Sequence, residues 1–364
     1  MTSAAPTEAE TDELSVSGSR TRARVAQPRR AFLELHNMIA IGYLVIMRGM
    51  LHFAAPEAAV ANRLDVTLAV LLVGCAVSSV PTEVWQRYVH GTWWRRWPGH
   101  IYRGLFVVVL AQSYLMLRDL LPLLNPGSLD AELLAIDEAI LGVTPALWLE
   151  RFNTRPVIEW FSAFYFSYFL ICATFIFGVL WFVRDLRLAR VFGIGGAVAF
   201  FLGQLIYVAV PGFGPVKYLD HAFAAPLNGG FFWGLVDVTV RQGGAMKDIF
   251  PSLHTALPTF MTLFASYAAK HDERWRIPSR VVAFFTVNII ISTMLLRWHY
   301  AIDVVAGLCL AFGAIGIAIW AAPREARIQR KHGLTTHWDW LDGGREVHPE
   351  TVSTPTSLAE RRDA

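Results

Sequence analysis

The sequence predicts an all-α integral membrane protein with a core of six transmembrane helices and two further transmembrane helices on its N-terminal side. Two observations carry this prediction. Of the 364 residues, 54% are hydrophobic and only 17% are charged, a balance far more apolar than that of an average soluble domain. The apolar residues also fall into blocks of about 20, the length that crosses roughly 30 Å of hydrocarbon at ~1.5 Å per residue.

Eight apolar blocks follow one another along the chain. They are residues 38–55, 64–80, 101–121, 157–183, 188–210, 251–269, 281–296 and 301–322. Arg48 and His52 weaken the first block, because ionisable residues within a span are costly. The expected organisation is a disordered cytoplasmic tail at 1–31, an N-terminal transmembrane region at 32–128, a membrane core at 129–322 and a cytoplasmic tail at 323–364. Polar composition also predicts disorder after His332.

The distribution of Lys and Arg predicts which side of the membrane each connection faces. If the N-terminus lies inside, the inner segments carry nearly three times as many Lys and Arg residues as the outer segments. Because positive residues accumulate on the cytoplasmic side, we expect a multi-pass cell-membrane protein with both termini in the cytoplasm. The net charge of +3 is too small to indicate a nucleic-acid partner.

Two outer connections are expected to carry structure of their own. Residues 129–152 alternate acids with Leu, Ile and Trp, a pattern typical of an amphipathic helix on the membrane surface. The longest connection, 211–250, contains a Pro-Gly-Phe-Gly-Pro run at 211–215 that cannot continue a helix, and a short apolar stretch at 231–240. Long ordered loops often carry function, so this connection is a candidate part of a site.

A Pro-Ser-Leu-His-Thr sequence stands where the long outer connection meets the sixth apolar block. Pro251 suits the first turn of a helix, where the amides of the next residues lack intrahelical partners. Such a helix start binds anions, so we expect Ser252 and the backbone at Leu253 to contact phosphate. His254 places an imidazole on the same turn, and Thr255 is a weaker candidate beside it.

The second cluster of polar residues lies at 297–303, between the seventh and eighth blocks. His299 and Asp303 are four residues apart, so on a helix the carboxylate can orient one ring nitrogen while the other faces a substrate. Arg297 supplies a guanidinium fork suited to phosphate oxygens. The spacing therefore predicts a nucleophile with an orienting carboxylate, and Tyr300 is a weaker candidate.

The same residues allow other interpretations. A lone His near a membrane interface is usually a hydrogen-bonded structural residue, and a lone Arg at the end of a span usually anchors lipid headgroups. Two His and an Asp could also bind a metal, but metal sites usually have further ligands, and we expect no metal here. Convergence of such groups on adjacent span ends favours a functional site. Lys217, Lys247 and Asp248 are weaker cases, each interpreted first as a loop or interface residue.

At these motifs the sequence resembles the type 2 phosphatidic acid phosphatase superfamily. That family has Pro-Ser-Gly-His at one helix start and, later, Ser-Arg, five residues, His, three residues and Asp. Here residues 251–254 read Pro-Ser-Leu-His, and residues 292–293 read Ser-Thr before His299 and Asp303. Both His and the Asp match, whereas a Leu replaces Gly and a Thr replaces the phosphate-binding Arg. The family's remaining motif, a Lys followed by Arg-Pro, is not present as written.

Within that superfamily, the motifs look more like the branch that contains inositol phosphorylceramide synthases and sphingomyelin synthases. Asp248 stands four residues before Ser252, and Tyr300 follows the second motif's His. The stretch 137–145 and the Gly-Pro pair at 214–215 also look like that branch. The resemblance covers about 137–322 and leaves the first two spans outside it.

The resemblance implies a six-helix phosphatase-type core that acts on lipid phosphate esters at the outer face of the membrane without a cofactor. His299 would form a phosphohistidine, Asp303 would stabilise the imidazolium and His254 would protonate the leaving group. Arg297 is the expected replacement for the missing phosphate-binding Arg, with Lys217 as the second candidate.

Three function classes follow from this interpretation. A polyol or lipid alcohol as acceptor would make the protein a head-group transferase, which the resemblance to the inositol phosphorylceramide synthase branch favours. Water as acceptor would make it a lipid phosphate phosphatase. A lipid transporter or flippase is more distant, because its ionisable residues would lie near the bilayer midplane rather than at span ends.

Overall fold

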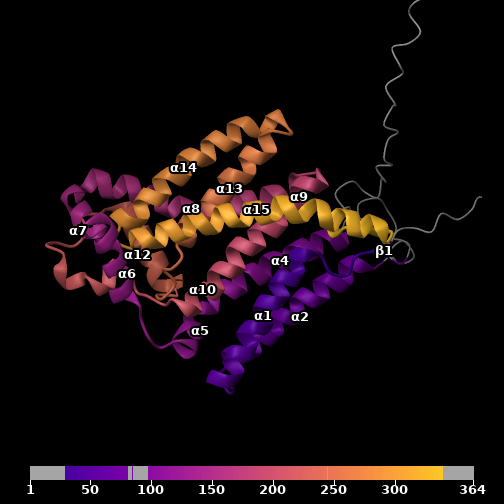
Figure 1. Cartoon of the computed structure of the whole chain (residues 1–364), viewed down its shortest axis with the longest axis horizontal. Coiled ribbons are helices and arrows are strands. Elements are labelled where there is room, and N and C mark those ends of the chain that lie inside the picture. The colour runs from indigo at the N-terminus through magenta and orange to yellow at the C-terminus, as the bar shows by residue number, and fades with distance from the viewer. Residues whose placement is uncertain (1–28, 81–83, 85–96, 244, 339–364) are drawn as a thin grey trace, which may run out of the picture.

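The computed structural model describes residues 29–80, 84, 97–243 and 245–338, and these residues are mostly helical (Figure 1). Six helical segments could cross a membrane by length and composition: α1 (Leu35–Ala54), α2 (Val60–Ser79), α8 (Arg155–Phe182), the run Leu186–Ala209, the segment Glu273–Leu295 and α15 (Ala301–Lys331). A seventh candidate is the pair α4 (Trp97–Leu115) and α5 (Leu117–Leu124), which is bent by 45°. The expected all-α membrane architecture is confirmed.

Each of the eight apolar blocks lies on helix, but two blocks differ from a simple span. The run Leu186–Ala209 consists of α9 (Leu186–Ala197), a π-helical turn η3 (Val198–Leu202) and α10 (Gly203–Ala209). The sixth block forms α13 (Leu253–Ala269), which has only 17 residues. It packs against both α15 and α14 (Arg276–Leu295), and η5 (Glu273–Trp275) leads into the latter.

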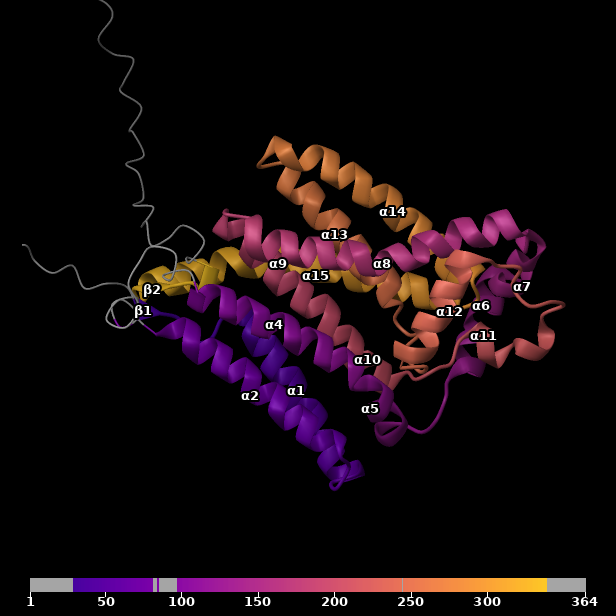
Figure 2. The ribbon, with the colours of Figure 1, turned by 180° about the vertical axis from the view of Figure 1, so that it is seen from behind.

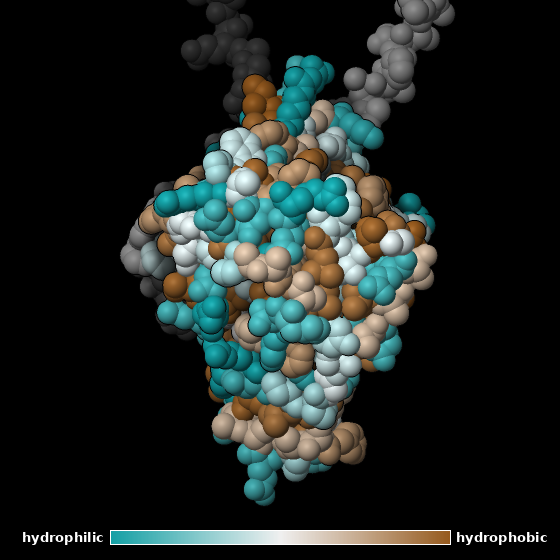
Figure 3. All heavy atoms as spheres, turned by 90° about the vertical axis from the view of Figure 1, so that its left-hand side faces the viewer, coloured by the Kyte–Doolittle hydropathy of each residue, from teal (hydrophilic) through white to brown (hydrophobic). Residues whose placement is uncertain are grey.

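The expected amphipathic surface helix is broken into three pieces. They are α6 (Asp130–Leu141), α7 (Pro145–Leu149) and the 3-10 turn η2 (Glu150–Phe152). Gly142 ends α6 because it adopts φ 68°, a left-handed conformation that glycine reaches without strain. The long connection at 211–250 forms α11 (Pro215–Tyr218), η4 (Asp220–Ala222) and α12 (Phe231–Gly243). Hydrophilic side chains cover much of this end of the molecule (Figure 3).

At the opposite end of the molecule, the structure corrects the expected extent of the two tails. Arg29–Arg30 (β1) pairs in parallel with Leu334–Thr335 (β2), and Trp338 is buried. α15 also continues nine residues beyond the expected end of the core, as far as Lys331. Residues 29–31 and 333–338 are therefore ordered, because the two segments pair with each other. The remainder of the expected tails, 1–28 and 339–364, lies outside the described residues.

The helices extend between these two ends (Figures 1 and 2). α13 packs against α9, α14 and α15, while α8 packs against α14 and α12. The N-terminal helices form a second set, in which α2 packs against α4 and α1 packs against α2 and α9. The connections that carry α6, α7 and α12 lie at the same end of the molecule as the first turns of α13 and α15 (Figure 1).

Candidate active site

The first turns of α13 and α15 are joined by close backbone contacts. The amide of Ser252 donates a hydrogen bond to the carbonyl of Asp303 at 3.0 Å. A Cβ added at Gly307 would lie 2.6 Å from the Ser252 carbonyl oxygen, so the approach of the two helices requires glycine there. This packing brings the rings of His254 and His299 to a centroid distance of 6.1 Å. Two residues 45 positions apart thus face one site.

The second motif has the geometry that its spacing predicts. His299 Nδ1 lies 3.2 Å from Asp303 Oδ2, and the amide of Tyr300 donates to the same oxygen at 2.9 Å. The chain between α14 and α15 is held because the amides of Trp298 and His299 donate to the Thr293 carbonyl. An ionised carboxylate can only accept a hydrogen bond, so in that state Nδ1 carries the proton and Nε2 keeps a free lone pair.

His254 is fixed by aromatic rings instead of a carboxylate. Its ring stacks on Tyr165 at a centroid distance of 4.5 Å, and Tyr168 lies at 4.2 Å. Its Nε2 is buried and has no hydrogen-bond partner among the described residues. A buried ring nitrogen without a partner is uncommon, and it leaves His254 ready to exchange a proton with a bound substrate. Sequence reasoning missed both tyrosines, although two tyrosines three apart inside an apolar block are a recognisable signal.

His254 and His299 line one end of a chamber of about 530 Å³. Asp248 lines the same end and accepts a hydrogen bond from the Tyr114 hydroxyl at 3.0 Å. Burial raises the pKa of the Asp248 carboxyl above its usual value, although the hydrogen bond from Tyr114 opposes this. The sequence-predicted candidates that the structure brings together are therefore the two histidines, Asp303 behind His299, and Asp248.

The expected phosphate donors of the first motif have structural roles. Ser252 is the N-cap of α13, and its hydroxyl oxygen accepts a hydrogen bond from the Thr255 amide at 3.2 Å. Ser252 and Thr255 are both fully buried, whereas the side chain of Leu253 lines the chamber. Pro251 stands before this cap, not in the first helical turn, so the helix begins two residues later than the sequence suggested.

Arg297 departs from its expected role. It adopts φ 67°, a left-handed and non-helical conformation, just beyond the end of α14. Its Nη2 donates to Glu150 at 3.1 Å and to the carbonyl of Ala225 at 3.0 Å, and its guanidinium lies over the Phe223 ring. Arg297 lies outside the set of described residues that line the chamber. The guanidinium thus connects η2 with the long connection at 211–250. Its charge is already neutralised by Glu150.

Lys217, like Arg297, lies outside the set of described residues that line the chamber, but it lies next to two residues of that set. Its Nζ lies 3.6 Å from the centre of the Phe213 ring, and both Phe213 and Val216 line the chamber. In the described part of the chain, Lys217 has no carboxylate within ion-pair distance. Lys247 differs, because it is buried and donates to three carbonyls at 125–127. Burial lowers the pKa of that amine below its usual value.

Two buried aspartates position the site, and sequence reasoning missed their role. Asp130 accepts hydrogen bonds from the amides of Phe213 and Gly214, both at 2.8 Å. The hydroxyl of Tyr300 donates to the same carboxylate at 3.0 Å, so Tyr300 is a tether and not a chamber residue. Asp137 accepts hydrogen bonds from two amides of the first turn of α15, at 2.7 and 2.8 Å. Together they connect α6 to the outer loop and to the second motif.

Asp137→Ala should destabilise the protein and slow the reaction. The change leaves two amides of the first turn of α15 without partners, and loss of such a cap costs about 0.5–2 kcal/mol. Because His299 precedes that turn, we expect the rate of phosphoenzyme formation to fall by about tenfold or more, as small misplacements of reacting groups cost ~100-fold. Thermal unfolding and single-turnover labelling would measure the two effects.

The exposed acid Glu132 of the same helix provides the matched control for this variant. Glu132→Ala should leave both quantities near those of the unchanged protein. A full rate in Asp137→Ala despite lower stability would reduce Asp137 to a purely structural residue.

A metal centre would need additional ligands. Among the described residues, no group of three or more His, Cys, Asp or Glu side chains is arranged to hold a metal ion. The described side chains at the chamber end include an imidazole paired with a carboxylate and a second imidazole.

Comparison with known proteins agrees with the motifs. A family model described as the PAP2 superfamily matches residues 131–317, just over half of the 364-residue chain. The matched range runs from α6 to α15 and includes His254, His299 and Asp303. No curated protein and no solved structure matches the chain. The family match over more than half of the chain leads to one conclusion: the chain belongs to the PAP2 superfamily, the type 2 phosphatidic acid phosphatase superfamily.

Proposed function

We propose that the protein transfers a head group of the inositol-phosphate type from a lipid phosphate ester to an alcohol acceptor through a phosphohistidine on His299. The observation that carries this proposal is the His299–Asp303 pair, which faces His254 at one end of an apolar chamber. Membership of the PAP2 superfamily supports phosphoryl transfer with lipid phosphate substrates in a membrane.

In the first half-reaction, Nε2 of His299 attacks phosphorus in line with the bond to the departing lipid alkoxide. The P–N bond forms as the P–O bond breaks, and His254 gives its proton to the alkoxide. Asp303 stabilises the imidazolium that results, since it accepts the Nδ1 proton. The lipid alcohol leaves, and the head group remains attached to His299 as a phosphohistidine.

In the second half-reaction, His254 has become the base. It takes a proton from the acceptor hydroxyl, whose oxygen attacks phosphorus and releases His299. The site supports transfer over hydrolysis because His299 is only 4% exposed and the chamber wall is largely aromatic and aliphatic. Such a wall disfavours water more strongly than it disfavours a lipid alcohol.

Phosphate oxygens need positive charge or hydrogen-bond donors, and Lys217 is our first candidate. The first turn of α13 adds the positive end of a helix dipole beside His254. Nucleophile, acid and phosphate donor then come from the chain itself, so the proposed reaction needs no metal and no cofactor.

The proposed orientation places both termini in the cytoplasm and the active site outside. Its support is the sequence-wide excess of Lys and Arg on the segments assigned to the inside. In the described part of the chain, the termini of α9 and α15 near β1 and β2 carry such residues, among them Arg187, Arg190, Arg324 and Lys331. The site lies at the other end of these helices.

Labelled phosphatidylinositol would test the proposed function. Purified protein in lipid nanodiscs is given the donor with and without a lipid alcohol acceptor. A new inositol-phosphate lipid that needs the acceptor and His299 supports transfer. Release of inositol phosphate or inorganic phosphate instead supports a lipid phosphate phosphatase. Movement of intact donor between the leaflets of a vesicle, without any new product, would support a lipid transporter or flippase.

Affinity for a phosphodiester lipid should fall as pH rises through the titration of Asp248. Burial places the pKa of this carboxyl above its usual range, so the group is neutral below that pKa and repels phosphate above it. Like charges about 10 Å apart at an effective dielectric of ~20 repel by ~1.7 kcal/mol, so we expect KM to rise by roughly tenfold.

Asp248→Asn should remove this rise in KM and keep the low-pH value, because the amide stays neutral. The comparison of the two KM profiles isolates the carboxyl, because the two proteins differ in no other titratable group. Identical profiles for the two proteins would exclude Asp248 as the group responsible.

A further inference from the structure

The chamber extends far beyond the catalytic residues. From its histidine end it follows α8 from Tyr165 to Leu180, a distance of about 22 Å at ~1.5 Å per residue. Residues of α4 (Phe106 to Leu115) and of α9 (Phe192 to Ala197) line parts of the same stretch, and Gly193 and Trp338 line its far end. The chamber therefore reaches across most of the hydrocarbon thickness of a bilayer, which is roughly 30 Å.

Polarity changes along the chamber. The ionisable side chains among its described lining residues, such as His254, His299 and Asp248, gather at the catalytic end. The far half is lined by aliphatic and aromatic side chains, among them Ile176, Phe192 and Phe200. A water molecule in such a space would lack polar partners, whereas hydrocarbon would not.

One side of the chamber is open. Leu115 of α4 and Phe169 and Phe177 of α8 line it and are also 40–50% exposed. In a membrane, side chains that are exposed at this depth face lipid tails. A tail could therefore enter sideways from the bilayer while its head group reaches the histidines.

Trp338 forms the floor. Its side chain is 1% exposed and packs with Leu180 and Ala189, and its ring lies 5.4 Å from that of His36. A Cβ added at Gly193 would lie 3.3 Å from the Trp338 ring, so α9 and the floor are in close contact.

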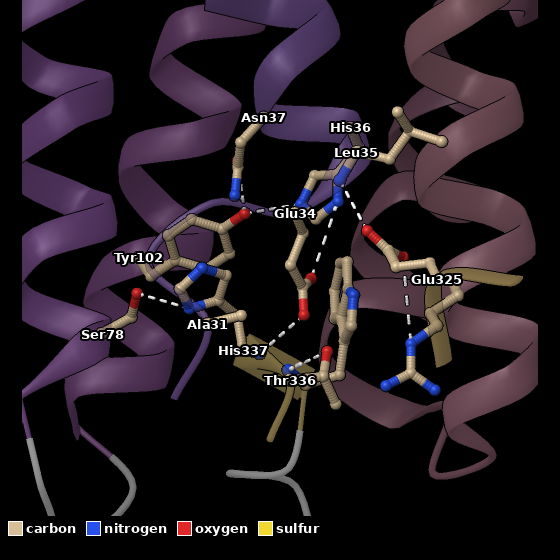
Figure 4. Close-up of polar contacts among 12 residues, drawn as sticks. Ala31, Glu34, Leu35, His36, Asn37, Ser78, Tyr102, Glu325, Thr336 and His337 are labelled. Atoms are coloured by element: carbon tan, nitrogen blue, oxygen red, sulfur yellow. Dashed lines mark hydrogen bonds and ion pairs between the residues drawn. The ribbon is translucent and has the colours of Figure 1, made fainter. Parts of the chain in front are cut away.

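A buried polar cluster holds this floor in place (Figure 4). Oε1 of Glu34 accepts hydrogen bonds from the His337 amide at 3.1 Å and from Gln329 Nε2 at 3.2 Å. The His337 ring lies 2.7 Å from the Ser78 hydroxyl through Nδ1 and stacks on Tyr102 at 4.8 Å. Residues before α1, in α2, in α4 and in α15 thus fix the segment that carries Trp338.

We propose that the chamber binds a hydrocarbon tail of the lipid phosphate, and that Trp338 sets the longest tail that fits while the phosphate is at His299. The head-group part of this inference rests on the proposed function. The occupant is identified by continuity, because one uninterrupted apolar space connects the phosphate-reactive imidazole with the floor.

A series of lysophosphatidylinositols that differ only in saturated tail length tests the proposal. Binding to the purified protein is measured by thermal stabilisation, which does not depend on catalysis. Affinity should rise with each added methylene until the tail reaches the floor, and then stop rising. Phosphohistidine formation is measured on the same series.

Two variants move the expected limit in opposite directions. Gly196 lines the chamber, and a Cβ there would meet only the Phe260 ring, at 3.7 Å. Gly196→Leu should therefore shorten the longest accepted tail without disturbing α9. Trp338→Ala should lengthen it. The matched control is Gly178→Leu, which adds the same side chain to α8 outside the chamber, where a Cβ meets nothing within 4 Å.

The outcomes separate the two proposals. A tail-length limit that stays the same in Gly196→Leu and Trp338→Ala overturns the floor, even if phosphohistidine forms normally. If Trp338→Ala does not fold, the longest tail accepted by Gly196→Leu alone decides whether the tail binds in the chamber. The longest accepted tail could shift as expected in both variants while no member of the series forms phosphohistidine. That result would support tail binding in the chamber and count against the proposed function.

Discussion

His299→Ala should yield no phosphoenzyme with any substrate, whereas His254→Ala should accumulate it from an activated one. The first variant lacks the nucleophilic Nε2, so no leaving group can compensate. The second lacks only the proton donor and acceptor. A nitrophenyl phosphate ester leaves without protonation, so it should still phosphorylate His299 in His254→Ala, while a natural lipid ester reacts roughly 100- to 10,000-fold more slowly.

Rapid-quench labelling with detection of acid-labile phosphate would measure this difference. The label should persist in His254→Ala, because no base remains to activate the acceptor in the second half-reaction. His221→Ala, which removes an exposed histidine of the outer segment, provides the control and should behave like the unchanged protein. Phosphate on His254 would reverse the two roles. Its absence from every active variant would favour direct attack by the acceptor.

Asp303→Asn should slow phosphoenzyme formation by about 100- to 1,000-fold, the usual effect of removing one charge-stabilising group from a water-excluded site. The amide oxygen can accept the same hydrogen bonds from His299 and Tyr300, so the ring should keep its position. What is lost is the negative charge that stabilises the imidazolium. The variant should therefore fall between the unchanged protein and His299→Ala.

Single-turnover rates with the nitrophenyl ester would measure the loss directly, because protonation of the leaving group does not limit that substrate. Glu132→Gln, which neutralises an exposed acid, provides the matched control. If Asp303→Asn reacted at the full rate, His299 would need another source of charge stabilisation, and the carboxylate would be only a structural cap of α15.

Local spacing was sufficient to predict the contact between His299 and Asp303, which lies at 3.2 Å. The two residues do not share a helical face, however, because His299 lies two residues before the start of α15. The apolar blocks likewise predicted helix positions, because helix length in a bilayer is set by hydrocarbon thickness. Both are properties of short stretches of chain, which a single sequence displays.

Long-range contacts account for what the sequence did not predict. Arg297 turns toward Glu150, which lies 147 residues earlier, and Asp137 reaches the first turn of α15 across 164 residues. The order of Trp338 depends on Glu34, whose partner His337 is 303 residues away. Polar composition alone predicted disorder there, since no local pattern records that a distant carboxylate is buried beside the segment.

The floor of the chamber and the two histidines lie in different parts of the chain. Trp338 follows the last helix, outside the range matched by the family model, whereas His254 and His299 lie inside it. Substitutions after α15 could therefore change which lipids are used while the reaction stays the same. Two homologues with identical catalytic residues could then serve different lipid pools, so assignment of a substrate to any relative would have to start from its C-terminal segment.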